Sequence, residues 1–146
     1  MSFQKGKKSR LPQRFVVNGE GWNISNIILY LGVTHDRHLT LSSHARGRLK
    51  LARQKSHRLY HLLTSQQISL RLKLQIYKAI IRPTLLYGAP LMRHLYKTTL
   101  TKLQSFQNSL LRRSIRGTSL QRARNREICE ELQLSTVPKF IGRRHI

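Results

Sequence analysis

The stretch that decides the fold is Ser69–Pro90, which reads SLRLKLQIYKAIIRPTLLYGAP. Its apolar residues recur every three or four positions, and this spacing predicts an amphipathic α-helix with one buried stripe. The stripe consists of Leu70, Leu74, Tyr77 and Ile81, and the basic residues off its centre are Arg71, Lys73, Lys78 and Arg82. Ser69 is the expected N-cap. Pro83 has no backbone N–H, so we expect the helix to kink or end near Arg82.

Charge is the strongest signal in the composition. The 146 residues include 28 Lys and Arg against 5 Asp and Glu, which gives a formal net charge of +23. Twenty of the basic residues fall between Asp36 and Glu127, an interval that contains no acidic residue. Such a surface repels itself unless a polyanion supplies the countercharge, so nucleic acid is the expected partner.

The rest of the composition narrows the class of protein. The length fits one modest domain or a piece of a larger one, and 39% hydrophobic residues fit a small core. The single cysteine, Cys129, fits a reducing compartment, so we expect an intracellular protein in the nucleus or in a cytoplasmic ribonucleoprotein. The apolar run Ile76–Leu86 is interrupted by Lys78 and Arg82 and is too short for a membrane span, so no membrane partner is expected.

The first forty residues predict a small β region after a basic lead-in. The lead-in is residues 1–14, and the β region is residues 15–40. Phe15-Val16-Val17, the turn dipeptide Asn18-Gly19 and a segment with Trp22 and Ile24 predict a β-hairpin. The run Ile27–Leu31, closed by Gly32, predicts a third strand. Three strands expose an edge and cannot close a core, which suggests a sheet cut from a larger one.

Residues 41–146 are expected to be helical, which makes the fold mostly α, with a bundle of three to four helices. The first helix begins near His44, with Ser42 or Ser43 as its cap and an inward stripe of Ala45, Leu49, Ala52, Ser56, Leu59 and Leu63. A later helix is capped by Thr98 and ends at Gly117, with an inward stripe of Leu100, Leu103, Phe106 or Gln107, Leu110 and Leu111. A shorter helix covers Asn125–Leu132, and Val137-Pro138 begins a last turn.

Four motifs occur along this chain in a fixed order. The first is Tyr30-Leu31-Gly32-Val33-Thr34, followed by Asp36, Leu39-Thr40 and His44; the second is Ile76–Pro83 with Leu86–Pro90. The third is Lys97–Gln104 with Gln107-Asn108 and Leu111-Arg112, and the fourth is Asn125, Ile128, Glu131-Leu132 and Val137. Together they span most of Phe15–Val137, and their order resembles the reverse transcriptases of non-LTR retrotransposons, especially the jockey-like group. Leu29, Leu41 and Leu91-Met92 depart from that pattern.

The resemblance implies that the chain is the last part of the polymerase domain of an RNA-directed DNA polymerase. It implies that Tyr30, Leu31 and Gly32 lie in a strand of the palm edge near the primer grip. The helices that follow would form the thumb along the template–primer duplex, with Ser69–Pro90 as its central helix. The implied partners are RNA, DNA or an RNA–DNA hybrid, together with the rest of a polymerase, and the implied metal of the parent enzymes is magnesium.

Catalysis by this chain is not expected. Nucleotidyl transfer needs two divalent metal ions about 4 Å apart, held by carboxylates, and Asp36 is the single aspartate in the sequence. The sequence therefore predicts no catalytic residue, no cofactor and no metal site. His35, His38, His44 and Cys129 lack the tight ligand spacing of structural zinc sites, and Cys129 is expected to be a small core residue.

The expected contacts with nucleic acid are electrostatic. Solvated helix faces usually mix charges of both signs, whereas these faces are almost purely basic. We therefore predict phosphate contacts, tolerant of base sequence, by some of Arg46, Arg48, Lys50, Arg53, Arg71, Lys73 and Lys78. Tyr77 and Tyr87 lie in apolar stripes and are expected to be core residues rather than stacking platforms.

A second hypothesis fits the same composition, namely a free-standing basic helical RNA-binding protein of the ribosomal type. The two hypotheses differ in what the gene encodes upstream of Met1. Palm motifs with paired Asp residues in the upstream nucleotides would favour the polymerase.

Overall fold

The computed structural model describes residues 14–23, 26–36 and 38–142, so nearly all of the lead-in predicted over residues 1–14 lies outside the described residues, as does Ile24. The strands are β1 (Arg14–Val17), β2 (Glu20–Asn23), β3 (Ile27–Tyr30) and β4 (Val33–Asp36). The helices are α1 (Ser42–Arg58), α2 (Tyr60–Thr64), α3 (Leu70–Ile76), η1 (Tyr77–Ile81), α4 (Arg82–Leu85), η2 (Ala89–His94), α5 (Lys97–Ser114), η3 (Ser119–Arg122), α6 (Asn125–Glu131) and α7 (Val137–Phe140). The predicted mostly helical fold with a small N-terminal β part is confirmed.

The β part consists of two antiparallel hairpins. β1 pairs with β2 around the predicted Asn18-Gly19 turn, where both residues have a positive φ. β3 pairs with β4, and Tyr30 lies opposite Val33 at the end of that ladder. The sequence predicted one strand in this second region, and β4 was missed because Thr34-His35-Asp36 is too polar to stand out as a strand.

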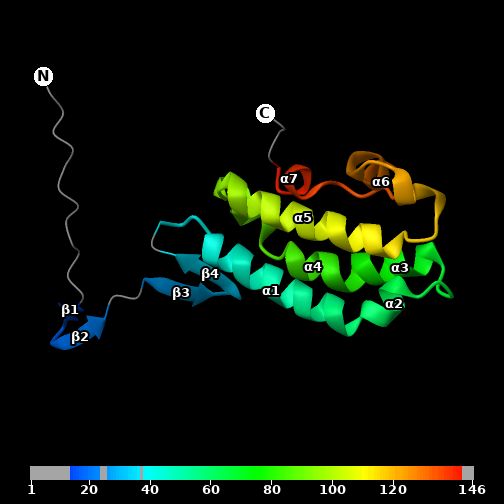
Figure 1. The fold of residues 1–146 in the computed structure, drawn as a ribbon. Coiled ribbons are helices and arrows are strands. Elements are labelled where there is room, and N and C mark those ends of the chain that lie inside the picture. Colours follow the sequence, from blue (N-terminus) through cyan, green and yellow to red (C-terminus); the bar gives the residue numbers. More distant parts are fainter. Residues whose placement is uncertain (1–13, 24–25, 37, 143–146) are drawn as a thin grey trace, which may run out of the picture.

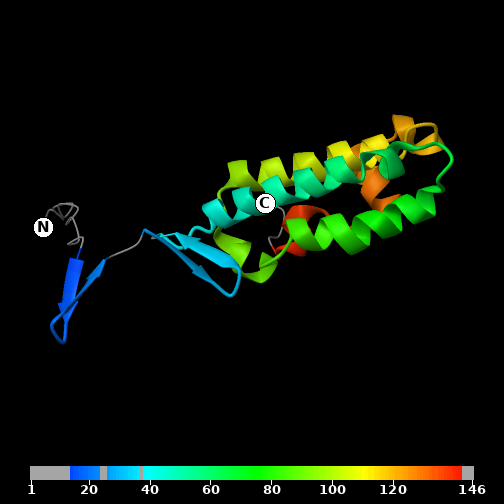
Figure 2. The ribbon, with the colours of Figure 1, turned by 90° about the horizontal axis from the view of Figure 1, so that it is seen from below.

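The helical body is built on three long elements that lie side by side. α1, α5 and the continuous run α3–η1–α4 extend in the same general direction in both views, with α6 and α7 along α5 (Figure 1 and Figure 2). The core between them is apolar and includes Ala45, Leu49, Ala52 and Leu63 of the predicted α1–α2 stripe. Within the described part of the chain, no helix combines the length and the apolar character needed to cross a bilayer.

A polar network around Asp36 forms the start of α1. Its carboxylate accepts hydrogen bonds from the backbone N–H of His38 at 3.1 Å and of Thr40 at 3.0 Å, and from the Thr40 hydroxyl at 2.7 Å. The helix then begins at Ser42, after Leu41 in the left-handed region. Leu41 at the N-cap position makes no side-chain cap, and the N–H of Ser42 donates to the Thr40 hydroxyl at 3.4 Å. The predicted cap by Ser42 or Ser43 is therefore wrong. Thr98 is not a cap either, because α5 already begins at Lys97.

Pro83 lies inside the long helical run rather than at its end. At η1 the helix widens into a π-turn, in which the N–H of Arg82 donates to the carbonyl of Tyr77. In an α-helix, Pro83 would lack a hydrogen bond and would crowd the carbonyl four residues earlier. A π-turn relaxes that constraint, so the disturbance expected near Arg82 is a wide turn, and the helix continues to Leu85.

The same π-turn decides which residues of the run are buried. Lys73, Tyr77, Ile81 and Leu85, at steps of four, are all buried, whereas Leu70 and Leu74 are only partly so. In a straight α-helix, steps of four drift around the axis by about 40° each. A wider turn reverses part of that drift and keeps the four residues in line. The predicted stripe of Leu70, Leu74, Tyr77 and Ile81 is therefore displaced toward Lys73.

Glutamines of α5 hold the bundle together through buried hydrogen bonds. The Tyr77 hydroxyl donates to Gln107 Oε1 at 3.0 Å, and both side chains are at most 1% exposed. Gln107 Nε2 donates to the carbonyl of Ser135 at 3.4 Å. Gln104 Oε1 accepts from the N–H of Val137 at 2.7 Å, at the first turn of α7. The sequence left open whether Phe106 or Gln107 belongs to the inward stripe of α5. In the structure Gln107 is buried, and Phe106 is only partly buried.

His44 attaches the β3–β4 hairpin to the helices. Its Nδ1 accepts from the N–H of Thr34 at 3.2 Å, so the neutral ring carries its proton on Nε2, which donates to the carbonyl of Tyr87 at 3.0 Å. Gly88 has a positive φ, and a Cβ there would lie 3.2 Å from Nε2, so a larger residue would displace the ring. Burial lowers the pKa of His44, and the positive charges of Arg48 and His35 add to it, outweighing the opposing hydrogen bond to Tyr87.

Removal of the Tyr77 hydroxyl tests the buried hydrogen bond. Tyr77→Phe leaves Gln107 Oε1 without its donor inside the core, and we expect the free energy of unfolding to fall by about 1 to 3 kcal/mol. The measurement is urea unfolding followed by circular dichroism. Tyr96→Phe is the matched control, because the Tyr96 side chain is 61% exposed, and its effect should stay within about 0.5 kcal/mol. Equal effects of the two substitutions would contradict the proposed role of Gln107.

The pH dependence of stability tests the contacts of His44. A histidine whose folded pKa lies below its ordinary 6.5 resists a proton that the unfolded chain accepts, so stability is full above pH 6.5 and falls as the pH drops below it. We expect His44→Gln to remove this part of the decline. His94→Gln, at an exposed position, should keep the wild-type pH profile. Urea unfolding between pH 8 and 5 measures both, and an unchanged profile in His44→Gln would refute the assignment.

Candidate nucleic-acid interface

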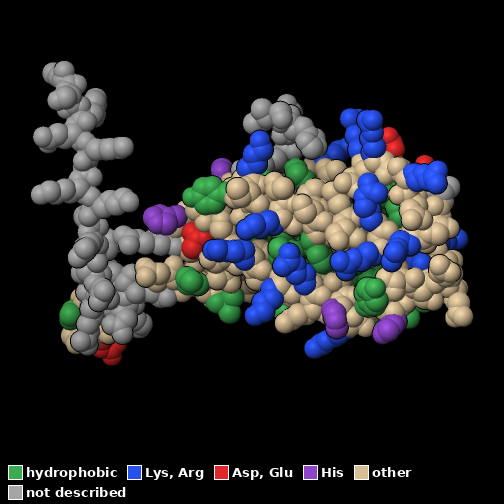
Figure 3. Space-filling model, in the orientation of Figure 1, with side chains coloured by type: hydrophobic (Ala, Val, Ile, Leu, Met, Phe, Trp, Pro, Cys, Tyr) green, Lys and Arg blue, Asp and Glu red, His purple; other side chains and the backbone are tan. Residues whose placement is uncertain are grey.

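Lys and Arg side chains gather along α1 and α5 on one face of the molecule, with apolar side chains visible between them (Figure 3). Acidic side chains are scarce on this face, because the chain has no Asp or Glu between Asp36 and Glu127. The ion pair between Arg126 and Glu130, at 2.9 Å, is the single salt bridge that joins two described residues. Within the described residues, therefore, no carboxylate neutralises the positive charge of the α1–α5 face.

The basic residues predicted on α1 lie on two different sides of the helix. Arg46, Lys50 and Arg53 follow one another at steps of four and three, which places them on one side of the helix. Arg53 lines a groove against α5, whereas Arg48 and Lys55 line a shallow depression against η1 and α4. Lys55 Nζ donates there to the Thr84 hydroxyl at 2.8 Å.

Arg48 belongs to a contact between α1 and the tip of the β3–β4 hairpin. Its Nη2 donates to the carbonyl of Gly32 at 2.8 Å, and its guanidinium lies 4.3 Å from the centre of the Tyr87 ring. The Tyr87 hydroxyl donates to the carbonyl of Leu31 at 3.0 Å. Tyr87 is 45% exposed, so its expected place in the core is wrong. Tyr30 ends β3, and Leu31 and Gly32 form the turn rather than a strand.

Lys73 is not part of any basic surface. It is 4% exposed, and its Nζ donates to the carbonyl of Ser114 at 3.2 Å. Ser114 is the last residue of α5, where the helix dipole favours a positive charge. The buried ammonium group of Lys73 is therefore not accessible for the predicted phosphate contact. Arg71 on α3 and Lys78 on η1 remain exposed, but neither lines the groove between α1 and α5.

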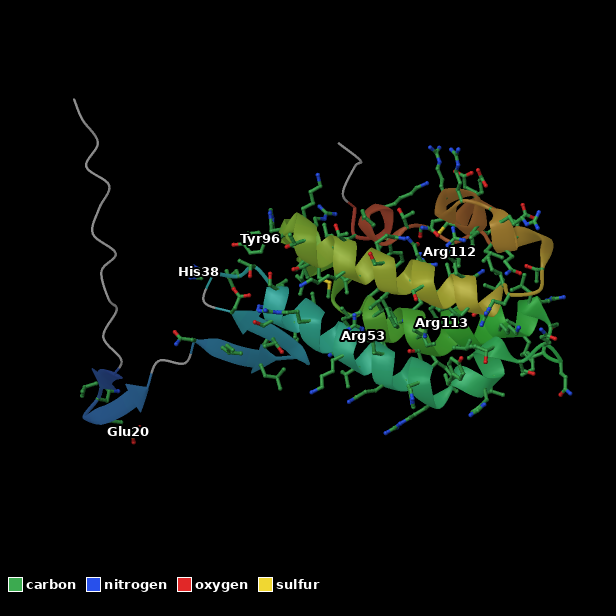
Figure 4. The ribbon with its side chains drawn as sticks, in the orientation of Figure 1. Glu20, His38, Arg53, Tyr96, Arg112 and Arg113 are labelled. Atoms are coloured by element: carbon green, nitrogen blue, oxygen red, sulfur yellow. The ribbon has the colours of Figure 1, made fainter. Side chains whose placement is uncertain are left out.

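A concavity of this face lies between the end of α1, α2 and α5, and its volume is about 480 Å³. We call it the α1–α5 groove. Its charged or ionisable lining consists of Arg53, His57, Lys102 and Arg113, and its aromatic lining consists of Tyr60 and Phe106. Figure 4 shows Arg53 of α1 and Arg113 of α5 on this same side of the molecule. Arg112 is not part of the groove lining, because its guanidinium donates to Asn125 Oδ1 at 2.7 Å and to the carbonyl of Ala123 at 3.0 Å.

Sequence reasoning missed the α5 side of this groove, although a signal for it exists. Lys102, Phe106, Ser109 and Arg113 recur at steps of four, three and four, which is a second stripe beside the buried one. This second stripe is overlooked when only the buried apolar stripe of α5 is considered. His57, from the last turn of α1, also lines the groove.

Three carboxylates of the described residues bind neighbouring groups of the chain itself. Partial burial opposes ionisation of Asp36, but the hydrogen bonds from Thr40, His38 and Leu41 outweigh it and lower its pKa. Glu127 Oε2 accepts from the N–H of Arg124 at 2.8 Å, and Glu130 pairs with Arg126. Among the described residues, no three Asp, Glu, His or Cys side chains come together as potential metal ligands. Cys129 is buried, as predicted, and burial raises the pKa of its thiol.

Comparison with known proteins identifies relatives among polymerases of mobile elements. The chain is 35% identical over 113 residues to the probable RNA-directed DNA polymerase from transposon X-element, 38% over 85 residues to that from mobile element jockey, and 30% over 109 residues to that from transposon BS, all from Drosophila melanogaster. These matches cover 77%, 58% and 70% of this chain but 12%, 9% and 12% of the relatives.

Two further comparisons found nothing. No family model matches the sequence, and no solved structure matches the fold. The relatives nevertheless confirm the resemblance read from the ordered motifs: the chain is related in sequence, over more than half of its length, to a segment of the RNA-directed DNA polymerases of non-LTR retrotransposons.

Proposed function

We propose that this chain binds the sugar–phosphate backbone of a template–primer, as part of the RNA-directed DNA polymerase of a mobile element, and that it does not itself perform nucleotidyl transfer. The observation that carries the proposal is the unneutralised basic face along α1 and α5. RNA, DNA and RNA–DNA hybrids all present the required phosphates. The nucleus or a cytoplasmic ribonucleoprotein is the compartment in which such a polymerase would meet them.

Free basic side chains support this proposal. Lys50 and Arg53 are exposed, and within the described residues their side chains make no hydrogen bond or ion pair. Arg46 donates only to the carbonyl of Ser42, at 3.3 Å, one turn earlier in the same helix. Cations held in this way remain free to reach phosphates, and phosphate contacts fix position without reading sequence.

The second hairpin supports a place within a larger polymerase. All four residues of β3 are exposed, and Ile28, Leu29 and Tyr30 are each at least 60% exposed. Leu31 at the adjoining turn is 75% exposed. Contiguous apolar surface of this kind is typical of contact with another protein segment, and the rest of the polymerase would supply that segment. The proposed role of Tyr30, Leu31 and Gly32 is the palm edge near the primer end.

A salt series tests backbone binding. If about five phosphates are engaged on an RNA–DNA hybrid, the logarithm of the association constant should fall with the logarithm of salt concentration at a slope of about −4 to −5. Fluorescence anisotropy of a labelled hybrid at increasing KCl gives the slope directly. A flat response would refute the phosphate contacts.

Single substitutions locate the contacts on α1. Lys50→Gln and Arg53→Gln should each reduce the magnitude of the salt slope by about 0.9, because each removes one phosphate contact. Arg126→Gln removes the same formal charge from a residue already paired with Glu130, so it is the matched control and should leave the slope nearly unchanged. Equal losses in all three variants would show that net charge, rather than this face, determines binding.

A further inference from the structure

The α1–α5 groove differs from the rest of the basic surface because it is concave and has aromatic walls. Its volume of about 480 Å³ falls within the range of pockets that hold small ligands. The groove is formed where α1 ends at Arg58 and the chain bends through Leu59 into α2. That bend brings Tyr60, the first residue of α2, to the wall opposite α5.

The aromatic residues supply apolar rings to the two walls. Tyr60 is 44% exposed, although it is a large aromatic side chain. Phe106 of α5 packs partly against the core and also lines the groove, with Leu63 and Leu110 beneath. Duplex bases have both faces covered by their neighbours, whereas an unpaired base can place a face against an aromatic ring. Partly exposed rings in a basic groove therefore suit an unpaired base better than a duplex.

The cations lie around the rings rather than apart from them. Arg53 belongs to α1, and Lys102 and Arg113 belong to α5, so the charges come from both walls of the groove (Figure 4). All three are exposed, and within the described residues none of their side chains is engaged in a hydrogen bond or ion pair. No acidic residue lines the groove. The phosphates on either side of a nucleotide whose base packs against the rings would therefore meet cations from both walls.

We propose that the α1–α5 groove binds an unpaired nucleotide of a single strand. The base packs against Tyr60 and Phe106, and the adjoining phosphates contact Arg53, Lys102 and Arg113. This inference rests on the proposed function, because the groove is part of the same basic face, and it adds a specific ligand class: a single-stranded segment bound through its bases as well as its backbone. Stacking on an aromatic ring is open to every base, so we expect binding to tolerate sequence.

The experiment separates base contacts from backbone contacts. Two strands of equal length are compared by fluorescence anisotropy: polythymidylate, and the same strand with abasic residues throughout, which keeps the phosphates and removes the bases. We expect the intact strand to bind about tenfold more tightly than the abasic strand. Phe106→Leu and Tyr60→Leu keep apolar bulk but remove the rings, and each should reduce this difference. Tyr96→Leu, at an exposed tyrosine outside the groove, should leave it unchanged.

The outcomes distinguish this inference from the proposed function. Arg53→Gln should weaken binding of both strands equally, because it removes a phosphate contact only. Equal binding of intact and abasic strands, with a steep salt slope on the hybrid duplex, would overturn the nucleotide site and leave backbone binding standing. Failure of every nucleic acid to bind would overturn both. Circular dichroism of each variant confirms that the fold is retained, and a loss in Phe106→Leu that equals the loss in Tyr96→Leu would also count against the site.

Discussion

Basic side chains in this fold have to be held without carboxylates, and much of the structure follows from that constraint. Between Asp36 and Glu127 the sequence offers twenty cations and no anion. Several of them bind backbone carbonyls instead: Arg48 that of Gly32, Lys73 that of Ser114, Arg82 that of Ser135, and Arg112 that of Ala123. Each bond joins two elements, so these cations stabilise the tertiary structure. Other cations, among them Lys50, Arg53, Lys102 and Arg113, lie exposed along α1 and α5, where an external anion can pair with them.

The motifs shared with polymerases are largely explained by internal contacts. Asp36 and Thr40 shape the loop before α1, and His44 joins the hairpin to the segment that contains Gly88. Arg82 donates to the Ser135 hydroxyl at 2.6 Å. Gln104 and Gln107 of α5 hold the segment that leads into α7. Motif residues of this kind keep hairpin and helices in one arrangement, and the unpartnered charges and groove aromatics lie mostly between the motifs.

The main helices and the Asn18-Gly19 hairpin could be predicted from the sequence because each depends on the spacing of nearby residues. Contacts between residues far apart in the sequence could not be predicted. Nothing local distinguishes Lys73, whose ammonium reaches the end of α5, from Lys78, which stays in solvent. Tyr87 has apolar neighbours in sequence, yet its hydroxyl is fixed by a carbonyl from the hairpin. The groove was missed for the same reason, since its two walls come from residues 53–64 and 101–113, and only packing brings them together.

The π-turn at Tyr77–Ile81 has a consequence for how this helix tolerates changes in length. A π-turn accommodates roughly one residue more than an α-helical turn, so the register of the run depends on the number of residues in that segment. Deletion of one residue there would let a regular α-helix form with the residues on both sides in nearly their present register, because the wide turn holds the extra residue. Lys73 and Tyr77 would keep their partners on α5, and Leu85 would stay in the core. The cost of such a deletion should come from Pro83, which would then crowd a carbonyl of the preceding turn, whereas a deletion in a regular turn of the run would rotate every residue beyond it by about 100°.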